Sequence, residues 1–436
     1  MAGGLIQLIS KGIIDNFITE LPEITYFKAV YMRHTNFSIE TYEEIFNGST
    51  NFGTTNIVKI NPNGDLISDM ILHVNLPSLN DKNIVNNLCV KGICDCYCDK
   101  CNKHSKKAIY SWVNGIGHLM IEYIELQIGG KIIDRQYGEW LEIWTELTQT
   151  NEKRPGYYEM IGKKEPTNFN HNSFTDSLSL YIPLNFWFCR NFGHALPIIS
   201  LYLEEIFVRI KWRNFDDCYI SNINGHKCNP ISYFNAILLV DNVFLDIDER
   251  EKFLAKTQMY VIDQAQFYDF NFSKSVKNPK IDLSIFSKPI KEIIWALQRN
   301  DVLEQDNDLP GNDWFNYGPN KNRLITIKKT INETFLSAKL VLNGCERIKD
   351  TKSTYFRLVQ PYKYHTRVPA NYIYLYSFSL KPEELQPTGS CNFSIFSNIH
   401  LLLHGVQLNT DYIVKVWATN INLLLIDDGM CGLAEM

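Results

Sequence analysis

The chain lacks the features of a membrane-spanning or nucleic-acid-coating protein. Within its 436 residues no apolar run approaches the roughly 20 residues that a membrane-spanning helix requires. The formal net charge is −5, whereas binding to a phosphate backbone requires a basic surface. The composition therefore argues against a membrane span and against direct contact with nucleic acid.

The N-terminal residues make a poor secretion signal, and we expect none there. Residues 1–11 contain no basic stretch followed by a long apolar one, and Ala2 excludes the myristoylation pattern. The chain has 11 cysteines, an odd number, which together with the missing signal indicates a reducing compartment and mostly free thiols. We expect a soluble protein that is made in the cytoplasm.

Catalytic signatures are absent as well. The sequence contains no Gly-x-Ser-x-Gly, no P-loop, no paired-carboxylate pattern and no clustered His-x-His of the cupin type. His400 and His404 resemble half of a zinc-protease motif, but the glutamate after the first histidine is missing. On a strand, residues four apart are roughly 13 Å from each other, too far to share a metal. We therefore expect that the protein is not an enzyme.

What the sequence does contain is a series of short β-strand patterns. In residues 66–76 apolar side chains alternate with polar ones, which is typical of a strand buried on one face. Helices are predicted at 137–147, from its amphipathic spacing, and from Asp246 to about 255, where an N-cap residue precedes Glu249 by three positions. The further predicted strands are 24–40, 57–60, 178–188, 206–212, 237–245, 260–272, 290–297, 372–380, 392–403 and 412–418. Many short strands without strand–helix alternation indicate antiparallel β-sandwiches.

Two hairpin patterns lie about half a chain length apart. Residues 124–134 turn at Gly129-Gly130, and residues 338–348 turn at Asn343-Gly344. Both dipeptides suit turns with positive φ, which match the twist of a β-hairpin. Each pattern follows a long polar loop and precedes an aromatic strand, so the sequence predicts two copies of one β-domain.

The predicted boundaries follow from this repeat. We expect an N-terminal arm at 1–23, a first β-domain at 24–247, a helical linker at 248–256 and a second β-domain at 257–436. Each domain is large enough to bury its own core.

A set of short stretches is spread in order over the whole chain. One of them is Tyr31-Met-Arg-His-Thr-Asn-Phe-Ser-Ile-Glu40, and another is Ile128-Gly-Gly-Lys-Ile-Ile-Asp134. The complete set comprises residues 2–5, 22–28, 31–40, 63–67, 128–134, 240–246, 249–250, 374–382, 386–394 and 429–433. Together these stretches resemble the major capsid proteins of nucleocytoplasmic large DNA viruses, a double jelly-roll family.

The resemblance implies an all-β fold of two eight-stranded jelly rolls in tandem, with short helices in the loops and the linker. It implies that three copies form a pseudo-hexagonal capsomer that tiles an icosahedral virus shell, so the protein resides in the virion after assembly in the host cytoplasm. Further implied partners are minor capsid proteins and, through the N-terminal arm, the side of the internal membrane. The loops 77–110 and 301–321 are expected on the outer face. The alternative function is that of a carbohydrate-binding or enzymatic double β-sandwich.

One cysteine-rich segment stands apart from the shared pattern. It contains Cys89, Cys94, Cys96, Cys98, Cys101 and His104. Four sulfur or nitrogen ligands form the tetrahedral site that zinc prefers, and a reducing compartment favours zinc over disulfides. Cys94, Cys96, Cys98 and Cys101 are the predicted ligands of a structural zinc ion, with Cys89 or His104 as a substitute for one of them. Free or late-oxidising thiols, and disulfides, are the alternatives; no other cofactor is expected.

Overall fold

The computed structural model describes residues 3–80, 109–166, 169–170, 172–222, 228, 231, 233–304, 311–322 and 333–434. The chain divides into two units, residues 1–37 and residues 38–436. Each unit is described separately below.

The N-terminal unit contains two short helices, α1 (Gly3–Ile9) and α2 (Ile13–Thr19), neither of which buries a side chain. The strand predicted from residue 24 is wrong over residues 24–36, which are exposed and outside any strand; β1 begins at Phe37. A high β-propensity reflects how well side chains fit a pleated, half-buried surface. Residues 24–36 take part in no described strand ladder, so their β-propensity has no such surface to act on.

The first sandwich consists of two four-stranded sheets. Sheet A has the order β1 (Phe37–Ile45), β10 (Asn235–Leu245), β3 (Leu66–Leu76) and β7 (Leu178–Pro183). Sheet B has the order β2 (Thr55–Ile60), β8 (Ile206–Trp212), β5 (Ile121–Ile128) and β6 (Lys131–Tyr137). A small additional sheet pairs β4 (Tyr110–Trp112) with β9 (Tyr219–Ser221).

The second sandwich repeats this plan. Sheet D has the order β11 (Gln258–Phe272), β19 (Tyr412–Asp427), β13 (Pro289–Arg299) and β16 (Ile373–Ser377), with β17 (Cys391–Asn392) beside β13 and β20 (Met430–Leu433) beside β19. Sheet E has the order β12 (Lys280–Asp282), β18 (Ile399–His404), β14 (Ser337–Leu342) and β15 (Cys345–Lys352).

The topology confirms the predicted repeat of two β-domains. Sheets A and D place their strands in the same sequential pattern, and so do sheets B and E. The two predicted hairpins are β5–β6 and β14–β15, which occupy equivalent positions. All four of their turn residues have positive φ, namely Gly129 (57°), Gly130 (78°), Asn343 (45°) and Gly344 (82°).

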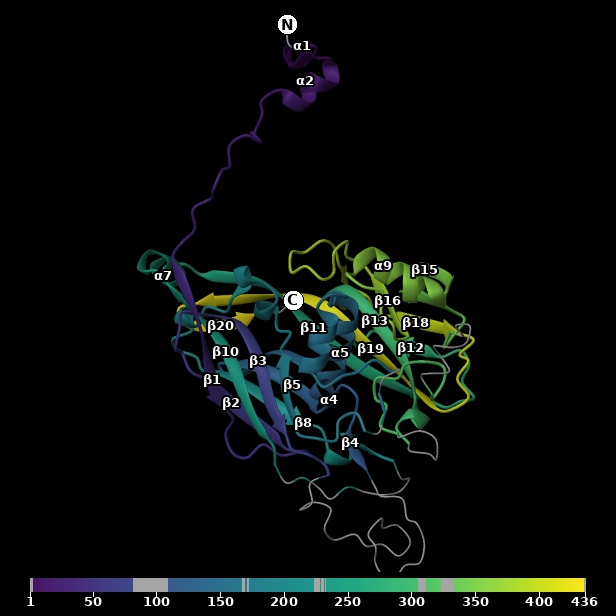
Figure 1. Cartoon of the computed structure of the whole chain (residues 1–436). Helices are drawn as coiled ribbons and strands as arrows, with labels where there is room; N and C mark the ends of the chain where they lie inside the picture. Colours follow the sequence, from purple (N-terminus) through teal and green to yellow (C-terminus); the bar gives the residue numbers. More distant parts are fainter. Residues whose placement is uncertain are drawn as a thin grey trace, which may run out of the picture. The chain divides into compact units, whose positions relative to one another are not determined.

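The helices lie in connections between strands (Figure 1). They are α4 (Ile116–Leu119), α5 (Gly138–Thr148), α6 (Arg154–Met160), α7 (Ile247–Leu254), the π-helical turn η6 (Tyr355–Val359) and α9 (Gln360–Tyr364), besides short 3-10 turns. The two predicted helices are confirmed as α5 and α7. The Asp246 side chain accepts a hydrogen bond from the Ile247 amide at the start of α7, so Asp246 is the predicted N-cap. Among the described helices none is long and apolar enough to cross a membrane.

Several predicted strands differ in extent from the observed ones. The strand predicted at 178–188 ends at Pro183 and gives way to the 3-10 turn η1 (Trp187–Cys189), because proline cannot donate to a strand ladder. The strand predicted at 392–403 divides into β17 and β18, separated by η7 (Phe393–Ile395). The strand predicted at 412–418 continues as β19 to Asp427, along the partner strand β11.

Candidate functional site: the junction of the sandwiches and an open sheet face

Helix α5 belongs to the first half of the sequence but completes the core of the second sandwich. Its side chains Trp140, Ile143, Trp144 and Leu147 are part of the second apolar core, whereas Leu141 faces the first. Figure 1 shows α5 between β5 and the strands β13, β16 and β19. The sequence predicted an amphipathic helix, yet ten of its residues are buried. The helix therefore joins the two sandwiches, and its polar side needs buried partners.

The first of these partners comes from the second sandwich. Lys415 on β19 donates to both carboxylate oxygens of Glu139, over 2.8 and 2.7 Å. Burial lowers the pKa of Lys415, although Glu139 counteracts this effect. The Arg213 guanidinium lies 3.8 Å from the same carboxylate. Since all three groups are largely buried, this ion pair fixes the orientation of α5 relative to sheet D.

A second buried cluster anchors α5 to the first sandwich. His118 Nδ1 lies 2.9 Å from Glu142 Oε2, and Lys163 pairs with Glu142 and, over 2.8 Å, with Glu146. Burial raises the pKa of Glu142, but Lys163 and His118 together outweigh burial and lower the pKa to about 2. Glu146 also pairs with Arg367 of the second sandwich. Glu142 and Glu146 are thus held ionised by buried cations, and the cations around Glu146 come from both sandwiches.

A third contact between the sandwiches centres on Asp263 of β11. Its Oδ2 accepts hydrogen bonds from Arg190 (3.1 Å) in the first sandwich and from the buried Lys291 (2.8 Å) in the second. The Arg190 guanidinium also lies over the Trp144 ring, 4.4 Å from its centroid. The junction therefore combines apolar packing with charges that are paired across it.

One histidine at the outer face of sheet D is held between two carboxylates. His365 Nε2 lies 2.7 Å from Glu292 and its Nδ1 lies 2.9 Å from Glu383. Burial lowers the pKa of His365, but Glu292 and Glu383 outweigh burial and raise the pKa to about 9. The imidazole is therefore a cation at neutral pH.

The outer face of sheet D, which is turned away from sheet E, is closed. Across this face run three rows of side chains from β19, β13 and β16: Lys415, Ala296 and Ile373; Trp417, Ile294 and Leu375; Thr419, Glu292 and Ser377. All nine are buried. The ion pair to Glu139 and the shared apolar core show that α5 supplies much of the cover.

The equivalent face of sheet A is open. Its rows are Ile237, His73 and Tyr181; Leu239, Ile71 and Pro183; Asp241 and Asp69. Each of these side chains is partly or largely exposed, and Tyr181 is 40% exposed. A face of this composition, with isoleucines and a leucine in its middle, is typical of a surface that another element covers.

A second exposed apolar surface lies at the C-terminal hairpin of the body. Leu425 and its neighbour Met259 on β11 are 45% and 66% exposed, and Met430 on β20 is 53% exposed. Tyr202 and Leu203 lie against the β19–β20 turn and are 66% and 64% exposed. These exposed side chains lie on or beside the strands at one end of sheet D.

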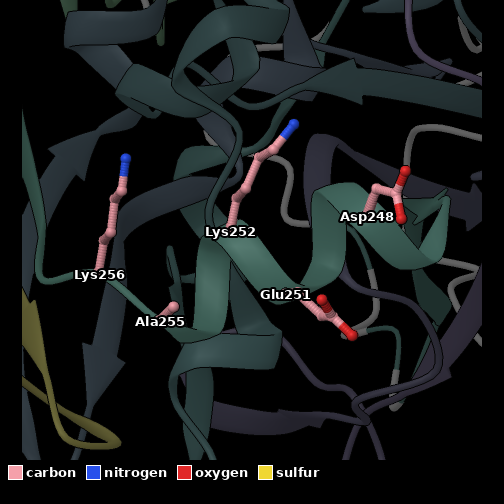
Figure 2. A pocket seen from close by; sticks show the side chains of 5 residues that line it. All are labelled: Asp248, Glu251, Lys252, Ala255 and Lys256. Carbon is pink, nitrogen blue, oxygen red and sulfur yellow. The ribbon is translucent and has the colours of Figure 1, made fainter.

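The linker helix α7 borders a shallow depression of about 390 Å³. Figure 2 shows the residues that line it, Asp248, Glu251, Lys252, Ala255 and Lys256, whose charged side chains extend away from one another. Such an arrangement offers no converging polar groups for a small ligand.

The predicted zinc ligands lie outside the described residues. This applies to Cys94, Cys96, Cys98 and Cys101 as well as to Cys89 and His104, so the zinc site stays a prediction. Elsewhere, the described ranges contain no group of three or more His, Cys, Asp or Glu side chains that could hold a metal ion. His400 and His404 both lie on β18, as the sequence indicated. The outward position of the loops 77–110 and 301–321 is likewise a prediction.

The sequence alone did not reveal the charged partners of α5. Glu142 and Lys163 are 21 residues apart and Glu139 and Lys415 are 276 apart. The one available signal was three glutamates on a helix that otherwise has large apolar side chains.

Comparisons with known proteins place the chain in a family. The family described as "Major capsid protein N-terminus" matches residues 25–246, and the one described as "Large eukaryotic DNA virus major capsid protein" matches residues 249–432. The chain is 36% identical to the major capsid protein of Pyramimonas orientalis virus, over 100% of this chain and 99% of that relative. It is 30% identical to the major capsid protein of Paramecium bursaria Chlorella virus 1, again over 100% of this chain and 99% of the relative.

Solved structures show the same fold. A quasi-atomic model of the PBCV-1 virus capsid matches with a TM-score of 0.74 at 27% identity, covering 94% of this chain and 100% of that chain. The Faustovirus major capsid protein matches with a TM-score of 0.73 at 12% identity, covering 96% and 94%. The predicted fold class, a tandem double jelly roll, is confirmed by these neighbours.

Proposed function

The chain belongs to the family of large eukaryotic DNA virus major capsid proteins, and from this premise we propose that three copies assemble into a capsomer of pseudo-hexagonal outline. Its function is that of a major capsid protein, and its place is the capsid shell of the virion. The proposal adds the trimer to this function, because a trimer provides the unit with which such a shell is tiled.

The observation that carries the proposal is the repeated topology within one chain. Two jelly rolls with the same strand order stand side by side, so one chain presents two nearly equivalent blocks. Three chains around a threefold axis then present six such blocks, while only one kind of interface between chains is needed. Hexagonal tiling follows from this outline.

The experiment is a measurement of mass in solution, by light scattering coupled to size-exclusion chromatography. We expect a particle of three times the chain mass of 50.6 kDa, and negative-stain images with six lobes. Obligate interfaces bury more than about 2,000 Å², so the trimer should persist to nanomolar concentration, on the order of 10⁻⁸ M. A protein that stays monomeric at micromolar concentration would contradict the proposal.

We further propose that the N-terminal arm, residues 1–23, contacts the internal membrane side of the shell and the minor capsid proteins there. In α2 the side chains Ile13, Ile14, Phe17 and Ile18 lie at helical spacing and are 91%, 74%, 88% and 71% exposed. An exposed apolar stripe on a short helix favours a lipid surface or an apolar groove of a partner.

Flotation with phospholipid vesicles tests the arm. We expect the full chain to float with vesicles, and a variant lacking residues 1–23 to remain at the bottom with its trimer intact. The double variant Ile14→Asp and Phe17→Asp should behave like the truncation, whereas Asn16→Asp, on the polar side of α2, should still float. If all variants float equally, the arm is not the membrane contact.

The alternative function, a carbohydrate-binding or enzymatic double β-sandwich, is not favoured by the relatives, which are capsid proteins. If the protein were a monomer in solution and bound glycans, this alternative function would be supported.

A further inference from the structure

The open face of sheet A has a closed counterpart in the same molecule. Sheets A and D are equivalent in strand order, with β10 corresponding to β19, β3 to β13 and β7 to β16. The outer face of sheet D is buried under α5, which comes from the neighbouring roll. The outer face of sheet A is left partly exposed in the single chain. The repeat therefore indicates that sheet A needs a helix that covers its outer face in the way that α5 covers the outer face of sheet D.

The second roll contains such a helix. Helix α5 follows β6, the edge strand of sheet B, and the helical segment η6–α9 follows β15, the equivalent edge strand of sheet E. Its residue Phe356 is buried in its own core, as Leu141 of α5 is in the first core. Leu358, Val359 and Tyr362, at helical spacing on one side of the segment, are 38%, 37% and 80% exposed. They are the apolar side chains of η6–α9 that would correspond to Trp140 and its neighbours, the side chains with which α5 packs on another roll.

Figure 1 shows α9 and β15 on one side of the body and β1, β10 and β3 on the opposite side, with α5 between the rolls. The segment η6–α9 therefore lies on the side of the molecule opposite to the sheet A of the same chain. A contact between the two must join different copies of the chain, and it must run from head to tail.

We propose that Leu358, Val359 and Tyr362 of one copy pack on the outer face of sheet A of a second copy, repeating between chains the contact that α5 makes with sheet D within a chain. The proposal rests on the trimer proposed above and names its interface. Three contacts inside chains and three between chains alternate around the ring, so the assembly closes with three copies.

The charges on the two surfaces are complementary. Asp241 and Asp69 face each other across β10 and β3 at one end of the sheet A face. Burial and, to a smaller extent, the neighbouring Asp241 raise the pKa of Asp69. On η6–α9, the exposed Lys363 follows Tyr362 directly. A lysine brought to this aspartate pair restores the kind of pairing that Glu139 and Lys415 make at the internal contact.

The test uses the full chain and three single variants. Tyr362→Glu alters the helix side of the contact, Leu239→Glu alters the sheet side, and Tyr202→Glu is the control, because Tyr202 is 66% exposed and lies beside the β19–β20 turn. We expect the first two to raise the trimer dissociation constant at least about thirtyfold, as loss of an interface hot spot does. The control should leave it unchanged. The far-ultraviolet circular dichroism spectrum of the Tyr362→Glu monomer should match that of the wild-type chain, since the tyrosine is 80% exposed and its replacement should leave the fold intact.

Mixing the two defective variants adds a signature that only a head-to-tail contact gives. The intact helix of Leu239→Glu meets the intact sheet of Tyr362→Glu, so the mixture should form one-to-one dimers at a concentration at which each variant alone is monomeric. A charge exchange gives the second check: Lys363→Glu and Asp241→Lys each weaken the trimer, and the double variant recovers it.

The outcomes separate the two proposals. If the wild-type chain is a monomer, the trimer proposal is wrong, and this inference is wrong as well because it rests on the trimer. If the wild-type chain is a trimer and both Tyr362→Glu and Leu239→Glu remain trimers like the control, the inference is overturned and the trimer proposal stands.

Discussion

Replacing Trp140 by alanine tests whether α5 is a structural part of the second jelly roll. Trp140 is fully buried in the second core although it is encoded among the strands of the first. Its indole nitrogen makes no hydrogen bond within the part of the chain that the structure describes, so the substitution removes packing and leaves no polar partner unpaired. We therefore expect the cost to fall on the second core, to which the strands of sheet D contribute many of the buried side chains.

The magnitude follows from the buried area. A tryptophan side chain buries about 150–250 Å², which at about 25 cal/mol per Å² corresponds to about 4–6 kcal/mol, an upper bound because the unfolded chain already buries some of this area. Tryptophan-to-alanine substitutions in cores cost about 3–5 kcal/mol. Since whole domains are stable by about 5–15 kcal/mol, Trp140→Ala should bring the second roll close to its unfolding limit.

The assay is hydrogen exchange measured by mass spectrometry on the full chain, together with urea unfolding. Trp140→Ala should accelerate exchange in β13, β16 and β19, while Trp212→Ala, an equally buried substitution in the first core, should accelerate it in β2 and β8. Faster exchange confined to the first roll in Trp140→Ala would refute the assignment of α5 to the second core.

Three further predictions concern titration and metal. The pKa of His365 is about 9 in the folded chain against about 6.5 in the unfolded chain. The stabilisation by its charge is therefore fully present below pH 6.5 and is lost as the pH rises through 9. In urea unfolding, the difference in stability between wild type and His365→Gln should shrink by about 3 kcal/mol between pH 6 and pH 9.5, and a constant difference would contradict this. Burial raises the pKa of Asp134 to about 6, although Gln136 and Arg190 counteract burial. Ionisation of Asp134 therefore destabilises the fold above pH 6 and has no effect below about pH 4. The variant Asp134→Asn should raise the thermal midpoint at pH 7.5 and leave it unchanged at pH 4. Purified protein should contain about one zinc ion per chain by elemental analysis, lost in Cys94→Ser but kept in Cys345→Ser, and a content below about 0.3 would exclude the zinc site.

Much of the fold could be predicted because it depends on local pattern. The strand at 66–76 and the turns at Gly129-Gly130 and Asn343-Gly344 follow from alternation and from positive φ, which neighbouring residues determine among themselves. Residues 24–36 were predicted as a strand and are none, since β-propensity without a partner strand does not form a ladder. The same limit applies to the ends of the strands, where partners such as β11 extend β19 to Asp427.

The sequence by itself determined the class of the protein: its repeated hairpins, its short alternating strands and its ordered resemblance to a capsid family are all properties of neighbouring residues. Only the tertiary structure decided how the two rolls are joined. It placed α5, whose spacing indicated an amphipathic helix, against the core of the neighbouring roll, and it paired Glu139 with Lys415 across 276 residues. The physical reason is that burial of a charge is tolerated only where an opposite charge meets it, and which charges meet is determined by the packing of distant segments.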